Sequence, residues 1–264
     1  MLKIQKAAIA PNPRKDWAHR LARELHGFLR KRGISVTSSR AHADILITIG
    51  GDGTILHEKQ HCKVPIFGIG SESSFVCQAR QHDWKQKLSR ALSSPRLDER
   101  MQLASTLNGH RLEDALNEVF IRNSDYRVLE FDLLADGRRF NFTADGVIFS
   151  TPTGSTAYAY SAGGAELRPN ARKYAVVGLA PYRRGFRPLV LGEKEKCTLI
   201  VHTRRPAIAV IDGQFCHELK AGINKLVVRK SGNYVSLLTH ERKEPGFSKK
   251  QKRILRTEEF YPVV

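Results

Sequence analysis

The stretch Asp44 to Glu58, DILITIGGDGTILHE, begins as a run of branched apolar residues and changes abruptly at Gly50-Gly51-Asp52-Gly53-Thr54. A short apolar run followed by turn residues is typical of a strand buried in a parallel sheet. Glycines directly after such a strand let backbone N–H groups approach a phosphate, and a helix that starts at Thr54 adds its positive dipole end. The stretch therefore predicts an α/β fold with a phosphate-binding loop formed by Gly50, Gly51, Gly53 and Thr54.

Asp52 stands in this loop, where it would repel a phosphate that is only being held. A carboxylate fits if phosphate is transferred, because it can orient an attacking hydroxyl, accept its proton or help to hold magnesium. The alternative is a tight turn in which Asp52 caps the following helix. The pentapeptide alone leaves both interpretations open. A Walker A loop is excluded, because the sequence contains no Gly-Lys-Ser/Thr.

Around this loop, the first part of the chain alternates between strand and helix patterns. KIQKAAIA reads as a strand, and Trp17, Leu21, Leu25, Phe28 and Leu29 follow at helical spacing before Gly33 ends the helix. TILHEKQH then predicts a short helix, VPIFGIG a strand and DWKQKLSRAL a further helix. Strands that alternate with helices pair in parallel, so we expect an α/β domain over residues 1–98.

The pattern changes after this domain. Short alternating strands are separated by Asp-Gly and Asn-Gly turns, which is typical of antiparallel hairpins. We therefore expect a β-rich domain over residues 99–240. Residues 241–264 form a basic tail, ERKEPGFSKKQKRILRTEEFYPVV, which we expect either to be solvated or to pack back on the first domain.

Composition narrows the class of protein. The chain has 264 residues and a formal charge of +18, which attracts polyanions such as nucleotide phosphates, polyphosphate or nucleic acid. No nucleic-acid-binding motif supports the last of these, although the charge leaves it open. Four scattered cysteines fit neither a disulfide framework nor a zinc knuckle. Without an apolar span or a signal-type segment, we expect a cytoplasmic protein that has no membrane partner.

Further motifs carry a family resemblance. LNE at Leu116 to Glu118 and DGVIFSTPTGSTAYAYSAGG at Asp145 to Gly164 follow GGDGT in this order, with RPLVL at Arg187 to Leu191 and DGQ at Asp212 to Gln214. The chain resembles the NAD kinases over most of its length. TPTGSTAY is the specific signal, because diacylglycerol and sphingosine kinases also carry GGDGT. The resemblance implies an α/β domain joined to a β-rich domain, with the active site in the cleft between them.

The resemblance also implies a reaction and its participants. A phosphoryl group moves from ATP or polyphosphate to the 2'-hydroxyl of the adenosine ribose of NAD, with Mg²⁺ accompanying ATP. The family implies a homodimer or homotetramer. ATP versus polyphosphate as donor, NAD versus NADH as acceptor, and the oligomeric state stay open. We also keep the alternative of a protein on the same fold that binds NAD or another nucleotide without turnover or with altered specificity.

The predicted site residues are polar groups around these motifs. Asn117 and Glu118 supply an amide and a carboxylate that suit an adenine edge, a ribose hydroxyl or a carboxamide, and the resemblance implies that they bind NAD. Asp145 is implied at the nicotinamide end, although Asp-Gly alone predicts a hairpin turn. The hydroxyls around Gly154 form a dense set of neutral donors, more than an N-capped helix alone would require. With Asp52 as the catalytic residue, the NAD-binding set is Phe75, Asn117, Glu118, Asp145, Thr153, Ser155, Thr156, Ala157, Tyr158 and Asp212.

One segment departs from the family pattern. NAD kinases usually have GxNxGxLGF where this chain has GIGSESSFVC at Gly68 to Cys77. Phe75 keeps an aromatic side chain for the pocket wall. Glu72 is new, and we expect it to make the pocket narrower or more acidic and to weaken the affinity for NAD.

A second pattern competes with the phosphate loop. His57, Glu58 and His61 match H-E-x-x-H, which on a helix places two imidazoles on one face for zinc. Pro65 ends this helix early and the segment continues the glycine loop, so we disfavour a zinc protease and predict no protein-held metal. We also disfavour a lipid kinase, because no amphipathic membrane-docking helix is present.

Overall fold

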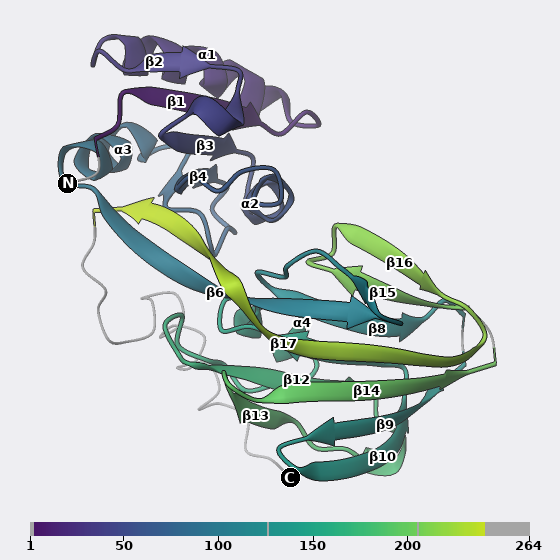
Figure 1. Ribbon diagram of the computed structural model, residues 1–264. Helices are drawn as coiled ribbons and strands as arrows, with labels where there is room; N and C mark the ends of the chain where they lie inside the picture. Colours follow the sequence, from purple (N-terminus) through teal and green to yellow (C-terminus); the bar gives the residue numbers. More distant parts are fainter. Residues whose placement is uncertain (1–2, 126, 205, 241–264) are drawn as a thin grey trace, which may run out of the picture.

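The computed structural model describes residues 3–125, 127–204 and 206–240, which form two lobes (Figure 1). The basic tail predicted over residues 241–264 lies outside the described residues. Within the described part of the chain, no helix is long and apolar enough to cross a membrane.

The N-terminal lobe is an α/β layer. Its parallel strands have the order β2-β1-β3-β4-β5. The elements are β1 (Lys6–Pro11), α1 (Asp16–Arg30), β2 (Ser35–Thr37), η1 (Arg40–His42), β3 (Ile45–Ile49), α2 (Asp52–Glu58), β4 (Ile66–Gly70), β5 (Ala79–Arg80) and α3 (Trp84–Ser93).

The apolar pattern explains how this lobe packs. Every residue of β3 and β4 is buried, as expected for central parallel strands. Helix α1 buries Leu21, Leu25 and Leu29 along one stripe against the sheet. It ends before Gly33, whose φ of 71° lies in the left-handed region that favours glycine after a helix.

The C-terminal lobe consists mainly of antiparallel strands in two facing groups. One group is a six-stranded sheet with the order β13-β12-β11-β8-β15-β16, and the other continues the large sheet in the order β10-β9-β14-β17-β6-β7. The two groups enclose a core that includes Phe131, Phe149 and Tyr174. The elements are β6 (Arg96–Leu107), β7 (His110–Arg111), β8 (Glu118–Asn123), β9 (Leu129–Ala135), β10 (Arg138–Ala144), β11 (Gly146–Ser150), η2 (Gly154–Thr156), α4 (Tyr158–Ser161), β12 (Lys173–Leu179), η3 (Tyr182–Arg184), β13 (Leu189–Gly192), β14 (Lys196–Thr203), β15 (Ala207–Ile211), β16 (Phe215–Leu219) and β17 (Gly222–Thr239).

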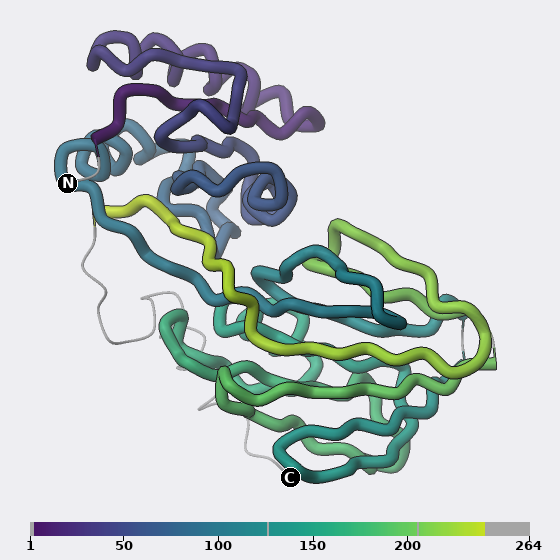
Figure 2. Tube along the Cα trace, viewed as in Figure 1, coloured from purple at the N-terminus to yellow at the C-terminus, as the bar shows by residue number. Residues whose placement is uncertain are grey.

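Two long strands join the lobes. Figure 2 shows β6 and β17 running side by side from the C-terminal lobe to the N-terminal lobe, and they pair in antiparallel fashion. Near its end β17 pairs in parallel with β4 through Leu237 and Ile66, so one large sheet is continuous across both lobes. The division at residues 98 and 99 falls inside β6 and stays a proposal.

The predicted fold class, an α/β lobe with a parallel sheet followed by an antiparallel β-rich lobe, is confirmed. The hairpin turns at Asp136-Gly137 and Asp212-Gly213 are also present. The hairpin suggested by Asp145-Gly146 is wrong, because β10 and β11 belong to different sheets. The strands β6 and β17 are also longer than the short strands expected, because they span the junction between the lobes.

Candidate active site

The glycine loop lies at the carboxyl end of β3. Gly51 has a φ of 131°, a conformation that strongly favours glycine, and α2 begins directly afterwards at Asp52. The loop forms one side of a cleft of about 220 Å³. The lining residues are Asn12, Lys15, Gly50, Gly51, Asp52, Gly53, Thr54, Ser71, Ser73 and Ser74.

Asp52 is bonded to a neighbouring segment of chain. Its Oδ2 accepts a hydrogen bond from the N–H of Phe75 at 2.6 Å, and its Oδ1 accepts from the N–H groups of Val76 at 3.0 Å and Cys77 at 3.1 Å. Gly51 occupies the N-cap position of α2, where no side-chain capping bond is found. The interpretation of Asp52 as a helix cap is therefore wrong. Its carboxylate fixes the 75–77 segment beside the glycine loop.

The LNE segment is held by Asp212 of the same lobe, which forms a buried charge pair with Lys59 of the opposite lobe. Asp212 accepts hydrogen bonds from the N–H groups of Leu116 at 2.9 Å, Asn117 at 2.6 Å and Glu118 at 3.2 Å. The ammonium group of Lys59, just after α2, lies 3.0 Å from Asp212 Oδ2, and the two side chains are 1% and 0% exposed. The end of α2 is thus tied to the segment that carries Asn117 and Glu118.

The TPTGSTAY segment packs directly on LNE. The Thr151 N–H donates to the Asn117 carbonyl at 2.9 Å. A Cβ on Gly154 would overlap the backbone of Asn117, so only glycine fits this close approach. Asn117 Oδ1, Glu118 Oε2 and Thr153 Oγ1 are buried side-chain atoms without a hydrogen-bond partner among the described residues. Buried polar atoms are normally paired, so this cluster suits a polar ligand.

The two halves of the site face each other. A Cβ on Gly53 would lie 3.8 Å from Nε2 of Gln214, which belongs to the same turn as Asp212. The rings of His57 in α2 and Phe215 in β16 are stacked with centroids 6.3 Å apart. The glycine loop and helix α2 therefore meet the turn that carries Asp212, and Asp212 in turn bonds the LNE segment.

Comparison with known proteins identifies the family. The family model of the ATP-NAD kinase C-terminal domain matches residues 116–239. An NAD kinase of Methanoculleus marisnigri is 34% identical over 247 residues, which cover 87% of this chain and 90% of that protein. An NAD kinase of Methanoregula boonei is 36% identical over 200 residues, which cover 74% of each chain. The chain belongs to the NAD kinase family.

Solved structures show the same fold. An NAD kinase of Archaeoglobus fulgidus in complex with ATP superposes with a TM-score of 0.77 at 23% identity and covers 95% of this chain and 97% of that one. A yeast NADH kinase complexed with NADH gives a TM-score of 0.85 at 19% identity, with 99% of this chain and 90% of that one covered. The arrangement of the two lobes is therefore that of the NAD kinases.

Within this candidate site, the environment of Glu118 changes its protonation. Burial, together with the nearby Asp212 carboxylate, raises the pKa of Glu118 to about 8. At neutral pH the side chain is therefore mostly a neutral carboxylic acid. It can then donate as well as accept a hydrogen bond.

Two of the residues predicted to bind NAD are buried and bonded within the protein. The Asp212 side chain is fully buried and accepts hydrogen bonds from the N–H groups of Asn117 and Glu118. The Ser155 hydroxyl is also buried, where it donates to the Pro152 carbonyl at 2.8 Å and accepts from the Leu167 N–H at 2.9 Å. Sequence patterns could not distinguish these roles, because the partners of both residues are set by the fold.

The remaining predicted residues lie on the open side of the site or away from it. Thr156 and Ala157 are half-buried, and Tyr158 is exposed with its ring edge against Phe120. Phe75 is 46% exposed beside Asp52. Asp145 is exposed at the far end of β11, because Gly146 pairs with Arg122 whereas Ser150 pairs with Glu118. Within one chain, Asp145 is not brought to the other predicted residues.

The divergent 68–77 segment does not place its acid in the glycine-loop cleft. The Glu72 side chain is 76% exposed and lies 2.9 Å from Nδ1 of His82. Ser71, Ser73 and Ser74 line the cleft instead. The expectation that Glu72 makes this part of the site more acidic is therefore not supported.

The H-E-x-x-H pattern runs across the end of α2, which stops at Glu58, and the rings of His57 and His61 lie 5.1 Å apart. Glu58 is buried and accepts from Arg40 Nε at 2.6 Å. In the described ranges, no group of three or more metal-ligating side chains of His, Cys, Asp or Glu is found.

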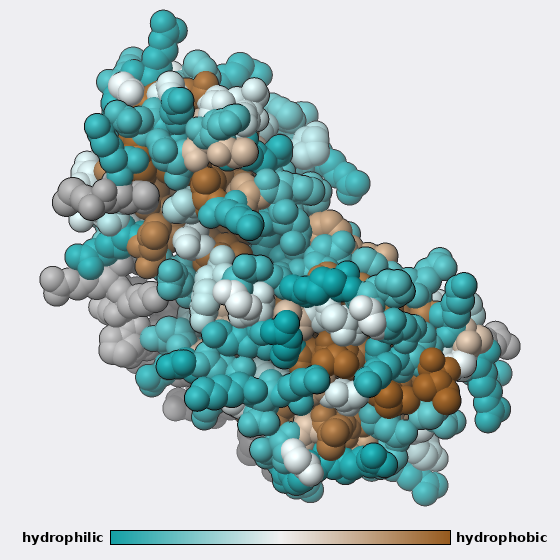
Figure 3. Space-filling view, viewed as in Figure 1, coloured by the Kyte–Doolittle hydropathy of each residue, from teal (hydrophilic) through white to brown (hydrophobic). Residues whose placement is uncertain are grey.

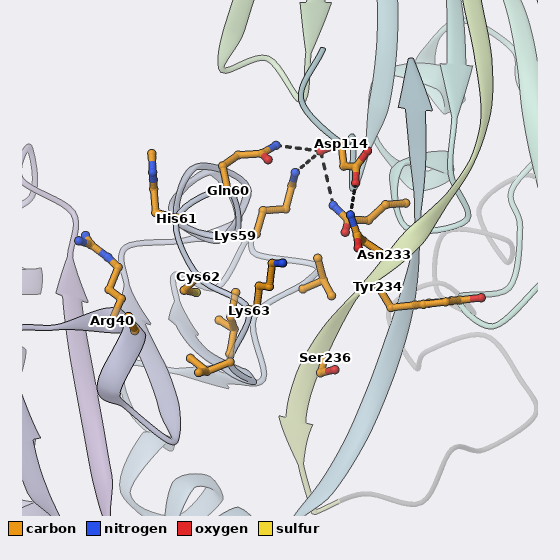
Figure 4. Close-up of a pocket in the computed structure, with 15 residues that line it drawn as sticks. Arg40, Lys59, Gln60, His61, Cys62, Lys63, Asp114, Asn233, Tyr234 and Ser236 are labelled. Atoms are coloured by element: carbon orange, nitrogen blue, oxygen red, sulfur yellow. Dashed lines mark hydrogen bonds between the residues drawn. The ribbon is translucent and has the colours of Figure 1, made fainter. Parts of the chain in front are cut away.

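A larger cavity of about 570 Å³ lies at the junction of the lobes and shares no lining residue with the glycine-loop cleft. Figure 4 shows Lys59, Gln60 and Asn233 pointing toward Asp114 on its wall. The Asp114 carbonyl accepts from Lys59 and Gln60, and its carboxylate accepts from Ser231 and Asn233. These groups satisfy one another, so Asp114 connects the end of α2 to the irregular part of β17 near Lys230 and Tyr234.

Sequence reasoning missed several residues of the site. Lys15 donates to the Gly50 carbonyl at 2.6 Å, and Asn12 Nδ2 donates to Thr54 Oγ1 at 3.2 Å. Both follow β1, which neighbours β3 in the sheet. The parallel order of these strands was the available signal, because it brings the segments after them to one edge. Lys59 carried no such signal, since its partner Asp212 is far away in the sequence.

Proposed function

We propose that this chain is an NAD kinase, which transfers the terminal phosphoryl group of ATP or polyphosphate to the 2'-hydroxyl of the adenosine ribose of NAD. The family membership supports this reaction. The non-catalytic alternative is not favoured, because the glycine loop retains Asp52, and Gly53 in this loop lies beside Gln214 of the turn that contains Asp212.

One observation carries the proposal for the acceptor. Asn117, Glu118 and Thr153 each present a buried polar atom that has no partner in the described part of the chain, and they lie on two segments that contact each other. Leaving such groups unsatisfied destabilises a protein by ~1–3 kcal/mol each. A dinucleotide rich in hydroxyl and amide groups would satisfy them. We therefore propose these three residues as direct contacts of NAD, with Thr156, Ala157, Tyr158 and Phe75 on the open side.

Asp52 is the proposed proton acceptor. Its Oδ2 accepts one backbone bond, and a carboxylate oxygen can accept two. The 2'-hydroxyl donates to this oxygen and transfers its proton as the ribose oxygen bonds to the phosphorus of the terminal phosphoryl group. The bond between that phosphorus and the leaving phosphate oxygen breaks, and the donor departs one phosphate shorter.

Mg²⁺ is the proposed companion of the donor. The glycine-loop cleft offers one carboxylate, together with hydroxyl groups and backbone amides. This set fits magnesium that arrives with phosphate oxygens better than a cage made only of protein ligands. Bound there, Mg²⁺ neutralises charge on the phosphates.

The test is an assay of NADP and NADPH formation that combines ATP or polyphosphate as donor with NAD or NADH as acceptor. We expect NADP from NAD and ATP, and loss of turnover when EDTA removes divalent ions. Asp52→Asn serves as the catalytic control. Binding of NAD without product under any donor would contradict the proposed function and favour the binding protein.

We also propose a homodimer or homotetramer in the cytoplasm. Apolar side chains are exposed on the C-terminal lobe, including Leu134, Val190 and Ile223, and Figure 3 shows apolar groups gathered on this lobe. A second copy also offers a way for Asp145 to reach an NAD site. The free cysteines fit a reducing compartment. Light scattering of the purified chain measures the oligomeric state, and a monomer would contradict this part.

A further inference from the structure

The position of Lys15 follows from the topology of the N-terminal lobe. In a parallel sheet with the order β2-β1-β3-β4-β5, the chain turns to opposite sides after β1 and after β3, and ligands bind outside the carboxyl ends of strands at such a switch point. Lys15 follows β1, the glycine loop follows β3, and Ser71 follows β4. These residues therefore lie at the same edge of the sheet, where the carboxyl ends of β1, β3 and β4 meet.

The Lys15 ammonium group lies over the glycine loop. Its Nζ donates to the Gly50 carbonyl at 2.6 Å and would lie 3.8 Å from a Cβ placed on Gly51. The lysine is the N-cap residue of α1, and its side chain is half-buried. Its charged end is thus held where backbone and side-chain groups face the cleft.

The electrostatics of the cleft favour an anion near Lys15. Lys15 is the one basic side chain among the lining residues, and Asp52 is the one acid. Three backbone N–H groups already bond to the Asp52 carboxylate. Over the ranges that the structure describes, Lys15 has no carboxylate partner, whereas its ammonium group has three N–H donors and gives one to Gly50.

The opposite wall adds neutral donors. Ser71 and Ser73 have hydroxyl oxygens 3.0 Å apart, and Ser74 Oγ would lie 3.5 Å from a Cβ on Gly51. A cleft with one cation, several hydroxyl groups and a glycine loop matches a chain of phosphates. A neutral or cationic ligand would leave the Lys15 ammonium group without an anionic partner.

We propose that Lys15 is a donor-binding residue that contacts the phosphoanhydride chain of the phosphoryl donor through its ammonium group. This inference rests on the proposed function, because it assigns the donor side of that site. The shared chemistry is a chain of linked phosphates, which can come from ATP or from polyphosphate.

The first test measures binding of inorganic tripolyphosphate by calorimetry, without NAD or turnover. Charge-assisted hydrogen bonds contribute about 1.5–3 kcal/mol, so Lys15→Met is expected to weaken binding by ~10- to 150-fold. Lys15→Arg should keep most of the affinity. The matched control is Lys85→Met, because Lys85 lies on α3, pairs with Glu24 at 3.4 Å and does not line the cleft. Unchanged binding by Lys15→Met would overturn the proposal.

The second test uses steady-state kinetics with ATP and with polyphosphate. Lys15→Met is expected to raise the KM for both donors by at least tenfold and to change the KM for NAD by less than twofold. Equal changes in the KM values for donor and NAD would overturn the assignment, because they indicate that Lys15 only supports the loop through Gly50. An effect on ATP alone would also overturn it, since contact with linked phosphates applies to both donors.

A third measurement uses the unaltered protein, so that the proposal can be tested even if Lys15→Met does not fold. Lysines of the unaltered protein are acetylated with and without tripolyphosphate, and mass spectrometry follows the modification of Lys15 and Lys85. Selective protection of Lys15 supports the proposal, and equal labelling overturns it. If the protein makes no NADP but tripolyphosphate still protects Lys15, the proposed function fails while the phosphate site stands.

Discussion

The glycine-loop cleft and the LNE segment form two halves of one site, but they are held by different interactions. In the cleft, half-exposed polar groups from the ends of β1, β3 and β4 face outward, and Asp52 is bonded to backbone amides. In the LNE segment, the backbone is bonded to Asp212, a buried carboxylate whose charge is balanced by buried Lys59. The glycine-loop cleft is open and charged, whereas the LNE segment is closed and carries polar atoms that have no partner within the described ranges.

Because of this difference, substitutions in the two halves should have different effects on turnover and on the free energy of unfolding. A charge in an open cleft is solvated whether or not the chain is folded, so its removal changes the folding free energy little. A buried charge pair is balanced only in the folded state, so removal of one partner leaves the other uncompensated. Removal of a charge in the cleft should therefore affect mainly turnover, and should lower stability only where structural hydrogen bonds are also lost, whereas substitutions behind the LNE segment should affect mainly stability.

The largest effect is expected from Asp52→Asn. The asparagine nearly preserves size but removes the basic oxygen, so kcat should fall by ~10²- to 10⁴-fold, the range for a positioned general base. Part of the 75–77 hydrogen bonding is also lost, which lowers the free energy of unfolding by about 1–3 kcal/mol. Steady-state kinetics and thermal unfolding measure the two effects separately.

The affinity for NAD provides the internal control for Asp52→Asn. It should change by only a few-fold, because the acceptor is held by the LNE and TPTGSTAY segments. NADP formation close to the unaltered rate would show that Asp52 only shapes the loop. The charged half of the site would then have no catalytic base.

The next largest effect is expected from Lys59→Met. Breaking the buried pair leaves Asp212 without its counter-charge and should lower the free energy of unfolding by about 3–5 kcal/mol. Urea denaturation measures this change. Lys63→Met is the matched control, because Lys63 is an exposed neighbour and should change stability by less than about 0.5 kcal/mol.

A double-mutant cycle sharpens this prediction. Lys59→Met combined with Asp212→Asn removes both charges, so the double variant should be more stable than the sum of the single changes predicts. Additive effects would show that the two side chains act independently. Additivity would thus contradict the claim that the LNE half of the site is held together by the Lys59–Asp212 charge pair.

The sequence predicted the local parts of this architecture well. The apolar stripe of α1 and the buried run of β3 depend on neighbouring residues, and both lie where expected. The resemblance to NAD kinases also predicts that GGDGT and LNE belong to one site. Asp212 shows the limit, because its hairpin position was visible but its full burial depends on amides of distant residues.

The ends of α2 show the same limit at shorter range. The sequence pattern predicts a helix over residues 54–61, but α2 runs from Asp52 to Glu58. The N-terminal end is set by the backbone of Gly51, and the segment beyond Glu58 is held by contacts of Lys59 and Gln60 with Asp114. Such tertiary contacts are not visible in a periodic pattern.

A pair of hydroxyl substitutions compares residues within the closed half. The Thr153 hydroxyl has no partner among residues 3–125, 127–204 and 206–240, so Thr153→Val should leave stability unchanged or slightly higher. The KM for NAD should rise by about tenfold through one lost hydrogen bond. The Ser155 hydroxyl is bonded, so Ser155→Ala should lower the free energy of unfolding by about 1–3 kcal/mol. A stability loss in Thr153→Val as large as that in Ser155→Ala would show that Thr153 is structural.

The smallest effect concerns the pH dependence of Glu118. Burial and Asp212 raise its pKa in the folded protein to about 8, from 4.5 in the unfolded chain. Because the folded state binds the proton more tightly, this contribution to stability is fully present below pH 4.5 and is lost as the pH rises through 8. Between pH 6 and 7, the group should lower the free energy of unfolding by about 1.4 kcal/mol.

The variant Glu118→Gln tests this contribution, because its side chain cannot titrate. Its free energy of unfolding should fall less steeply between pH 6 and 7, by about 1.4 kcal/mol per pH unit less than in the unaltered protein. Urea denaturation of both proteins at several pH values measures the difference in slope. Parallel slopes would mean that Glu118 is already ionised in the folded state, which requires a solvated or charge-compensated carboxylate and a more open LNE segment.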